Sequence, residues 1–310
     1  MSVALVVEPD VPPMSWDVFC ASRPNYSIAL DGYVHGGPQF SLDGPMANFN
    51  HHEGVDRLST RATCAQVLMA IRQGLFSSFR RDGVPTAYVY VNDCDEDVCT
   101  AWTLLRHPHL VTSTMNPVLN RLVSMEDMLD STAGGYPFPA DLPALQEMAW
   151  IFQPYRLFRS GGGLSKKSPI AFRSVIEDVE ARIIKHLTGR GDSIPLDTRY
   201  SQIDRVGPVV IVTEEGAQAR TGMFADGIRM FVSVRPGDHS TTYTIGKMSK
   251  FEPLDLDVLT RRLNEAEGCT TDRWGGADII IGSPRVGGSK LTLGQIKDLI
   301  GATLADRHAA

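Results

Sequence analysis

Short β-rich segments that each stop on an acidic or amide side chain are the feature of this sequence that most constrains its fold. Residues 26–30 (YSIAL) end on Asp31, residues 46–49 on Asn50-His51-His52-Glu53, and residues 87–91 (AYVYV) on Asn92-Asp93. Apolar residues at helical spacing follow over 60–79, and a further helix is expected over 95–105. Strands that alternate with helices predict an α/β domain with a largely parallel sheet flanked by helices.

The remaining patterns predict two domains, 1–190 and 205–310. The first 25 residues are expected to be an irregular lead-in, and helical patterns cover 116–130, 141–158 and 169–188. The polar stretch 189–207, punctuated by glycine and proline, predicts a linker. Beyond it, strand-like runs at 208–216, 219–227, 228–237 and 240–249 precede a helix (256–268), a strand (277–283) and a last helix (292–308). These predict a smaller, mixed α/β domain.

Charge and cysteine content narrow the classes of function. The net charge of -6 gives no general attraction for duplex DNA, which favours a small substrate or a short nucleic acid. No apolar run reaches the roughly 20 residues that a membrane span needs, and the N-terminal residues do not resemble a signal peptide. Five cysteines without a CxxC pair suit a reducing compartment. We therefore expect a cytoplasmic protein without a membrane partner, and a homodimer is left open.

Four clusters of acids and histidines occur within about a hundred residues. They are Asp31, Asn50-His51-His52-Glu53, Asp93-Cys94-Asp95-Glu96-Asp97 and Glu126-Asp127-Met128-Leu129-Asp130. Because ligands bind beyond the carboxyl ends of strands in open α/β sheets, the first three clusters are expected to converge. Mixed carboxylate and imidazole ligands suit Mn²⁺, with Mg²⁺, Fe²⁺ or Zn²⁺ as alternatives. The predicted metal ligands are Asp31, His51, Asp93, Asp95, Asp127 and Asp130, with the last two as alternatives to each other.

Each cluster also has a structural explanation. A single aspartate after a strand is commonly a helix N-cap or a turn residue, which applies to Asp93 and Asp95. The acids of 126–130 are typical of a solvated helix face. Adjacent histidines are harder to explain in this way, and four clusters together favour a metal site.

These clusters resemble the motifs of the DHH phosphoesterase superfamily, and most of all its DHH-type exonuclease branch in eukaryotes. The stretch from Asp31 through Gly36-Gly37 to Phe49-Asn50-His51-His52 has the layout of that branch, and 60–65 (TRATCA) is similar to its helix start. Cys94-Asp95-Glu96-Asp97 looks like the first motif and Glu126–Gly134 like the fourth. The resemblance covers about residues 26–290.

The chain departs from the family pattern in two ways. The first motif normally precedes the histidine pair, whereas its best match here, 94–97, comes afterwards. Either a circular permutation keeps the strand ends adjacent, or 93–97 is the fourth motif and the first is lost. The second departure is Asn50, which stands where the family has aspartate. If that position orients a ligand through a hydrogen bond, asparagine can replace it at partial cost; if it binds metal, affinity should fall.

The predicted C-terminal domain contains a glycine-rich turn of the kind that many DHH proteins use to bind substrate. The predicted substrate-binding residues are Gly275, Gly276, Ser283, Arg285 and Lys290. Small residues expose backbone N–H groups that can hold an oxyanion, and the two cations would bond to phosphate. An ordinary β-turn with two surface cations is the alternative.

The resemblance implies metal-dependent hydrolysis of a phosphoester. The predicted catalytic residues are His52, Asp31 and Asp95, with His52 facing the scissile phosphate as electrophile or proton donor. The expected substrate is a small phosphorylated metabolite, a nucleotide or a short oligonucleotide. Hydrolysis of a non-phosphate bond is one alternative, and a degenerate protein that binds a nucleotide or a partner without catalysis is another.

Overall fold

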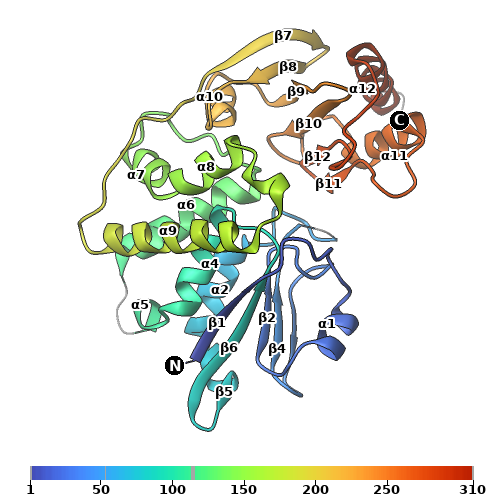
Figure 1. The fold of residues 1–310 in the computed structure, drawn as a ribbon. Coiled ribbons are helices and arrows are strands. Elements are labelled where there is room, and N and C mark those ends of the chain that lie inside the picture. Colours follow the sequence, from blue (N-terminus) through green and yellow to red (C-terminus); the bar gives the residue numbers. More distant parts are fainter. Residues whose placement is uncertain (1, 53, 113–115, 309–310) are drawn as a thin grey trace. The chain divides into compact units, whose positions relative to one another are not determined.

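The computed structural model describes residues 2–52, 54–112 and 116–308, and its internal contacts divide the chain into two compact units (Figure 1). Unit 1 comprises Met1–Ser131 and Asp141–Pro195, and unit 2 comprises Thr132–Ala140 and Leu196–Ala310. The sequence does not predict that the short segment Thr132–Ala140 belongs with the C-terminal unit. None of the helices in the described ranges is long and apolar enough to cross a membrane.

The sheet of unit 1 is mixed, with the strand order β1-β6-β2-β4-β3. Its parallel strands are β1 (Ser2–Val7), β6 (Val84–Val91), β2 (Ser27–Leu30) and β4 (Met46–Phe49). Two short strands run antiparallel to their neighbours, β3 (Gln39–Ser41) beside β4 and β5 (Arg80–Arg81) beside β6. The mixed α/β class is confirmed, but the sheet as a whole is not largely parallel, because these short strands reverse direction.

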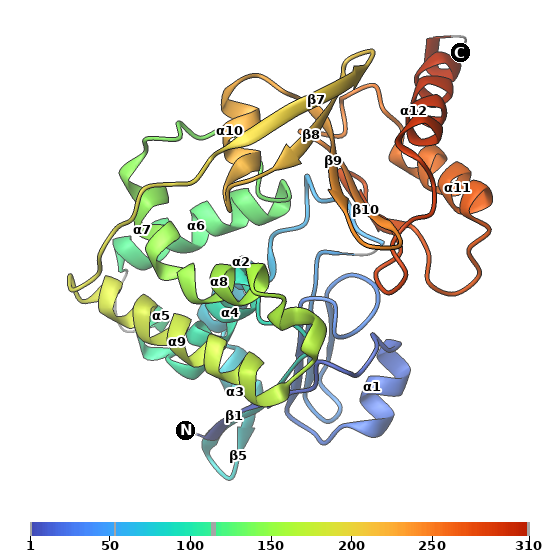
Figure 2. The ribbon, with the colours of Figure 1, turned by 45° about the horizontal axis from the view of Figure 1, so that its top comes forward.

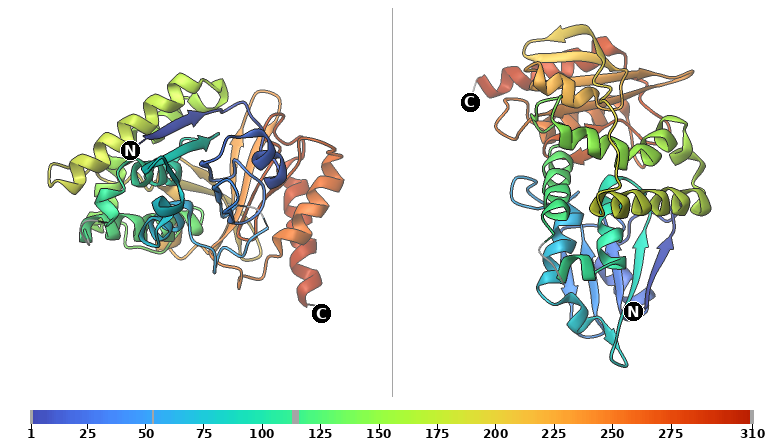
Figure 3. Two further views of the ribbon diagram at one scale, coloured as in Figure 1. Left: turned by 90° about the horizontal axis from the view of Figure 1, so that it is seen from below. Right: turned by 90° about the vertical axis from the view of Figure 1, so that its left-hand side faces the viewer.

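Helices cover both faces of this sheet. On one face lies α1 (Trp16–Ser22), whose Phe19 packs against Ala29 and Tyr90. On the other lie α2 (Thr63–Arg72), α4 (Glu96–Arg106) and α9 (Pro169–Leu187), as the view from below shows (Figure 3, left). The remaining elements of unit 1 are α3 (Leu75–Ser78), α5 (His109–Thr112), α6 (Pro117–Ser131), α7 (Pro143–Ile151), α8 (Gln153–Ser160) and the 3-10 helix η1 (Gly163–Lys166).

The prediction of an irregular lead-in over the first 25 residues is wrong. Ser2–Val7 forms β1, which pairs in parallel with β6 and buries Val3, Leu5 and Val7. Ser15 then caps α1 by accepting a hydrogen bond from the backbone N–H of Val18. Pro9, Pro12 and Pro13 lie between these two elements, where they disturb neither.

Unit 2 contains a second mixed sheet, with the strand order β11-β12-β10-β9-β8-β7. Its strands are β7 (Tyr200–Val206), β8 (Val209–Glu214), β9 (Met230–Pro236), β10 (Thr241–Lys247), β11 (Gly275–Ala277) and β12 (Ile280–Gly282). β8 and β9 are parallel, and the other pairs are antiparallel. Helices α11 (Leu256–Glu267) and α12 (Leu293–His308) pack on one face and α10 (Ala219–Ala225) on the other (Figure 2).

Two predictions for this unit need correction. Residues 219–225 form the helix α10 instead of a strand, because Ala219, Met223 and Phe224 lie on one helical face and are buried. The predicted linker 189–207 is also too long, since β7 begins at Tyr200 and pairs with β8 on both sides of an irregularity at Ile203. The exposed, polar side chains of β7 gave its sequence the composition of a linker.

Candidate metal centre

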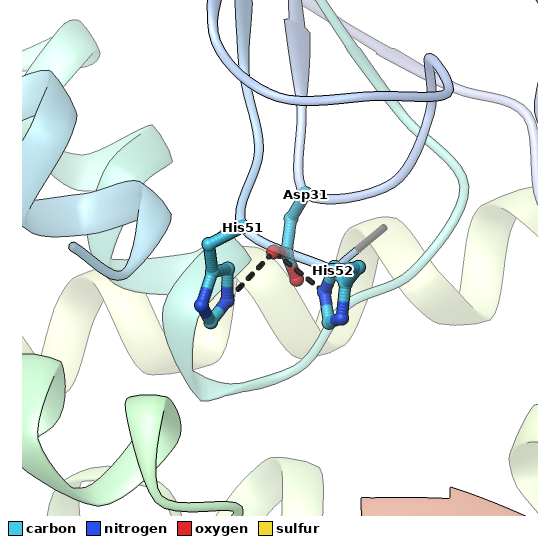
Figure 4. A group of neighbouring side chains, drawn as sticks. All are labelled: Asp31, His51 and His52. Carbon is cyan, nitrogen blue, oxygen red and sulfur yellow. Dashed lines mark ion pairs between the residues drawn. The ribbon is translucent and has the colours of Figure 1, made fainter. Parts of the chain in front are cut away.

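The histidine pair and Asp31 come together because two parallel strands end side by side. In the register of β2 with β4, Leu30 lies opposite Phe49, so Asp31 and Asn50 begin neighbouring loops. The backbone N–H of Asp31 donates to the Phe49 carbonyl oxygen at 2.8 Å. Asp31 has a φ of 50°, in the left-handed region that aspartate tolerates better than most residues. This turn directs its carboxylate toward both imidazoles (Figure 4).

Three carboxylates surround Nε2 of His51, which is completely buried. This nitrogen lies 2.7 Å from Oδ2 of Asp130, 3.4 Å from Oδ1 of Asp31 and 3.5 Å from Oδ2 of Asp97. Two groups of side chains bring their ligand atoms within 4.8 Å of one another, namely Asp31, His51, His52 and His51, Asp97, Asp130. The carboxylates come from the end of β2, the first turn of α4 and the last turn of α6.

The chemistry of this donor set fits a divalent cation. Nε2 of His51 and Oδ2 of Asp130 are both buried and lie 2.7 Å apart, and neither has a hydrogen bond to any other described residue. Burial, together with the charges of Asp31 and Asp130, raises the pKa of Asp97 to about 7. A cation held among these carboxylates would offset their mutual repulsion, and mixed oxygen and nitrogen ligands suit Mn²⁺. Asp31, His51, Asp97 and Asp130 are the side chains that would hold it.

The neighbouring carboxylates favour the charged form of His51, whereas they disfavour the charged form of Asp97. Burial alone would lower the pKa of His51, but Asp130 and Asp31 outweigh burial and raise it to about 10. An imidazolium at this position balances part of the negative charge of the cluster. A metal ion would therefore bind in competition with the proton on His51.

Asn50 uses both atoms of its amide group to hold the loops of the site. Its Nδ2 donates to the carbonyl oxygens of Val34 and Gly36 at 3.0 and 2.7 Å, and its Oδ1 accepts from the backbone N–H of His52 at 3.0 Å. The side chain is buried, and these three hydrogen bonds engage both its amide nitrogen and its oxygen. Asn50 therefore orients the histidine pair. Glu53, the last member of the same cluster, lies outside the described residues.

Three of the predicted ligands make other contacts. Asp95 caps α4 by accepting from the N–H of Val98 at 2.9 Å, and Asp93 accepts from the N–H of Cys94 at 2.7 Å. Asp127 accepts from the N–H of Ala62 at 2.7 Å and pairs with Arg61. None of the three belongs to a convergent ligand group among the described residues. Asp95 nevertheless lies close enough that burial, with the charges of Asp31 and Asp93, raises its pKa well above the usual range.

Sequence reasoning missed Asp97 as a candidate ligand, although it recognised the acidic run that contains it. The α2 helix has no side-chain cap of its own, because its N-cap residue is Ala62. Asp97 fills that role from α4, accepting from the N–H groups of Thr63 and Cys64 at 2.7 Å each. These bonds hold the carboxylate rigidly beside His51. The one signal in the sequence was that Asp97 follows the cap position of α4 by two residues.

The glycine-rich turn of unit 2 has its own internal anion. The backbone N–H groups of Arg285, Val286 and Gly287 all donate to the carboxylate of Asp272, at 2.8–3.0 Å. The N–H of Lys290 donates to Glu267 at 2.7 Å. These N–H groups of the turn therefore donate to Asp272 and Glu267 and are not free to bind an oxyanion.

The side chains of the predicted substrate-binding residues in this turn differ in exposure. Ser283 is buried, and its hydroxyl accepts from the N–H of Tyr243 at 3.1 Å. The side chains of Arg285 and Lys290 are exposed. A role for these two cations in binding substrate stays a prediction.

Replacing Gly276 with alanine should destabilise unit 2, whatever the substrate. A methyl group at this position would fall well inside van der Waals contact with the carbonyl oxygen of Ile280, across the pairing of β11 with β12. We expect a loss of about 1–3 kcal/mol in the free energy of unfolding, measured by urea denaturation. Gly275→Ala is the matched control, because nothing lies within 4 Å of its added methyl group. Equal losses for both variants would contradict this explanation.

The candidate metal centre is thus built from four separate segments of unit 1, with one histidine at its middle and a second at its edge. The side chain of His52 is 41 % exposed, whereas that of His51 is completely buried. The arrangement offers a buried ligand set and one imidazole that solvent reaches. No protein-family model matches the sequence, and no curated protein matches it either.

Proposed function

We propose that this protein is a metal-dependent phosphoesterase that acts on a small phosphorylated metabolite, a nucleotide or a short oligonucleotide. The observation that supports the proposal best is the convergence of Asp31, Asp97 and Asp130 on Nε2 of His51. The resemblance of these segments to DHH motifs gives separate support. Carboxylates with one imidazole form the kind of ligand set with which metallophosphoesterases hold Mn²⁺ or Mg²⁺.

The β6 strand bears on the unusual order of the motifs. Although β6 follows β2 and β4 in the chain, it lies between β1 and β2 in the sheet and runs parallel to both. The acidic run 93–97 that follows β6 therefore lies at the same edge of the sheet as Asp31. It would lie there too if the first motif preceded the histidine pair in the chain. This neighbourhood is what the circular-permutation hypothesis requires.

Each group in the site has a distinct task in the proposed reaction. A bound divalent ion would polarise the phosphoryl oxygens and lower the pKa of a bound water. Asp31, Asp97 and Asp130 supply the carboxylate oxygens that would bind the ion, and the buried His51 excludes solvent from the centre. His52 lies against Asp31, with Nε2 2.8 Å from Oδ1, and is the imidazole that a substrate can reach. It is therefore the proposed proton donor to the leaving oxygen.

Turnover of generic phosphoesters by the metal-loaded protein tests this proposal. The chelated protein is reloaded with Mn²⁺ or Mg²⁺ and offered phosphodiester and phosphomonoester substrates. We expect hydrolysis that requires the metal and stops when a chelator is added. Because loss of metal removes several kcal/mol of transition-state stabilisation, the rate should fall by about a thousandfold.

Metal content separates the alternatives when no turnover is seen. About one or two ions bound per chain without phosphoester hydrolysis would overturn the phosphoesterase proposal and favour another hydrolysable bond. Less than about half an ion per chain after loading would favour a protein that binds a nucleotide or a partner without catalysis.

A further inference from the structure

Arg57 is a buried cation at the metal centre that neither the sequence patterns nor the family resemblance single out. It lies in the loop between the histidine pair and α2, and it is 7 % exposed. Its Nη2 is 3.0 Å from Nδ1 of His52, and its Nη1 donates to the backbone carbonyl oxygen of Asp130 at 2.9 Å. Burying a guanidinium is costly unless its N–H groups find partners. Here Nη1 and Nη2 find the main chain beside a candidate ligand and one imidazole, while Nε has no hydrogen bond among the described residues.

The contact with Arg57 assigns the hydrogen on the His52 ring. A guanidinium has only N–H donors and no acceptor, so Nδ1 of His52 must present its lone pair. A neutral imidazole then carries its hydrogen on Nε2. That nitrogen lies 2.8 Å from Oδ1 of Asp31, which accepts the hydrogen bond. The ring is therefore fixed between a donor on one side and an acceptor on the other.

This arrangement is the reverse of the one that metal-binding histidines use. Such a histidine binds the ion through one nitrogen and donates the other N–H to a carboxylate or carbonyl oxygen. If His52 bound a metal through Nε2, its Nδ1–H would point at the N–H groups of Arg57. Of the two ligand groups, the one formed by His51, Asp97 and Asp130 avoids this conflict, and the one that includes His52 does not.

We propose that Arg57 is a positioning residue that keeps His52 out of the metal's ligand set and holds its Nε2–H toward Asp31. Through its bond to the Asp130 carbonyl, the same guanidinium also fixes the end of α6 that carries a candidate ligand. The significance of Arg57 for catalysis rests on the proposed phosphoesterase function. The assignment of the His52 ring does not, so the two can fail separately.

Nitrogen NMR of histidine-labelled protein tests the ring assignment without any assay of activity. His52 signals are identified by their loss in His52→Gln, and Mg²⁺ serves as a diamagnetic ion. In the wild type we expect Nδ1 of His52 to be unprotonated and Nε2 protonated, with and without Mg²⁺, while the His51 nitrogens shift on loading. In Arg57→Ala the two His52 tautomers should become mixed, and Arg57→Lys should restore part of the preference because an ammonium also only donates.

Arg121→Ala is the matched control, because this arginine also forms an ion pair in unit 1, with Glu147, which lies near His186 instead of His52. It should show the wild-type His52 spectrum. A hydrogen on Nδ1 in the wild type, or the loss of the hydrogen from Nε2 of His52 on metal loading, would overturn the proposal. These two spectra decide the matter even if Arg57→Ala does not fold.

Kinetics provide the second measurement if the protein hydrolyses phosphoesters. Loss of an outer hydrogen-bond partner typically costs about 10–100-fold in activity or metal affinity. We expect Arg57→Ala to lower kcat by this factor with a smaller change in KM, and Arg57→Lys to recover part of it. An unchanged kcat in an active, folded Arg57→Ala would contradict the positioning role.

Discussion

His51→Gln is expected to abolish the thermal stabilisation that Mn²⁺ gives to the wild-type protein. A ligand that binds the folded state alone stabilises it by about 2.7 kcal/mol at a hundredfold excess over its Kd. For a unit of this size, that corresponds to a rise of roughly 5–10 °C in Tm. Because Nε2 of His51 is the atom on which all three carboxylates converge, removing the imidazole should remove most of this rise. Scanning calorimetry with and without Mn²⁺ measures it.

Asp130→Asn provides a second variant in case the buried His51 is needed for folding. Its Oδ2 lies 2.7 Å from Nε2 of His51 and has no other partner among the described residues, so the amide removes the negative charge at this position. The matched comparison is Asp127→Asn on the same helix, whose side chain bonds to the Ala62 N–H instead of facing His51. We expect Asp130→Asn to reduce the Mn²⁺-dependent rise in Tm much more than Asp127→Asn does. His239→Ala, an exposed histidine of unit 2, should retain the full rise.

A wild-type Tm that does not respond to Mn²⁺, Mg²⁺ or Zn²⁺ would contradict the metal centre itself. An equal loss of the rise in Asp127→Asn and Asp130→Asn would show instead that the ligand set extends along α6. The first outcome would leave a buried cluster in which His51 alone balances the charge of the carboxylates. The second would retain a metal site with a larger ligand set.

The location of the site could be predicted because it depends on local features of the chain. Each strand end that carries an acid or histidine is marked by an apolar run followed by polar residues, and α4, α6 and α9 lie within two residues of their predicted bounds. Parallel strands then bring their ends to one edge of the sheet without further information. This is why Asp31 and His51 could be paired from the sequence alone.

Which acid faces His51 could not be predicted, because that choice depends on contacts between distant segments. Asp93, Asp95 and Asp97 look equivalent in the sequence, yet only the last reaches across to the uncapped start of α2. Arg57 bonds to Asp130, 73 residues away in the chain. The β1 strand was missed for a similar reason, since its partner β6 lies some eighty residues further on. A local sequence pattern does not predict contacts between residues that lie so far apart in the chain.

The contacts of Asn50 account for one departure from the family pattern and lead to the second large prediction. Asn50→Asp, which would restore the family's residue, should destabilise the protein and should not tighten metal binding. The amide donates to the carbonyl oxygens of Val34 and Gly36, and a carboxylate cannot donate to either. It would also place an unpaired negative charge in a buried position beside the acidic cluster. Such a loss typically costs about 3–5 kcal/mol.

Asn120→Asp is the matched control for this prediction. There the same substitution acts on an amide oxygen that accepts from Arg72 at 2.6 Å, which a carboxylate accepts at least as well. Urea unfolding should therefore show a large loss of stability for Asn50→Asp and little or none for Asn120→Asp. Calorimetric titration with Mn²⁺ measures the affinity of each variant that folds.

The opposite result would change the interpretation of the site. If Asn50→Asp were as stable as the wild type and bound Mn²⁺ more tightly, position 50 would be a ligand position. The loops around Val34 and Gly36 would then have to rearrange, since their carbonyl oxygens lie within 3.0 Å of the present amide nitrogen. If the prediction holds, this asparagine is part of the architecture that aims His51 and His52, and its presence is no sign of a lost active site.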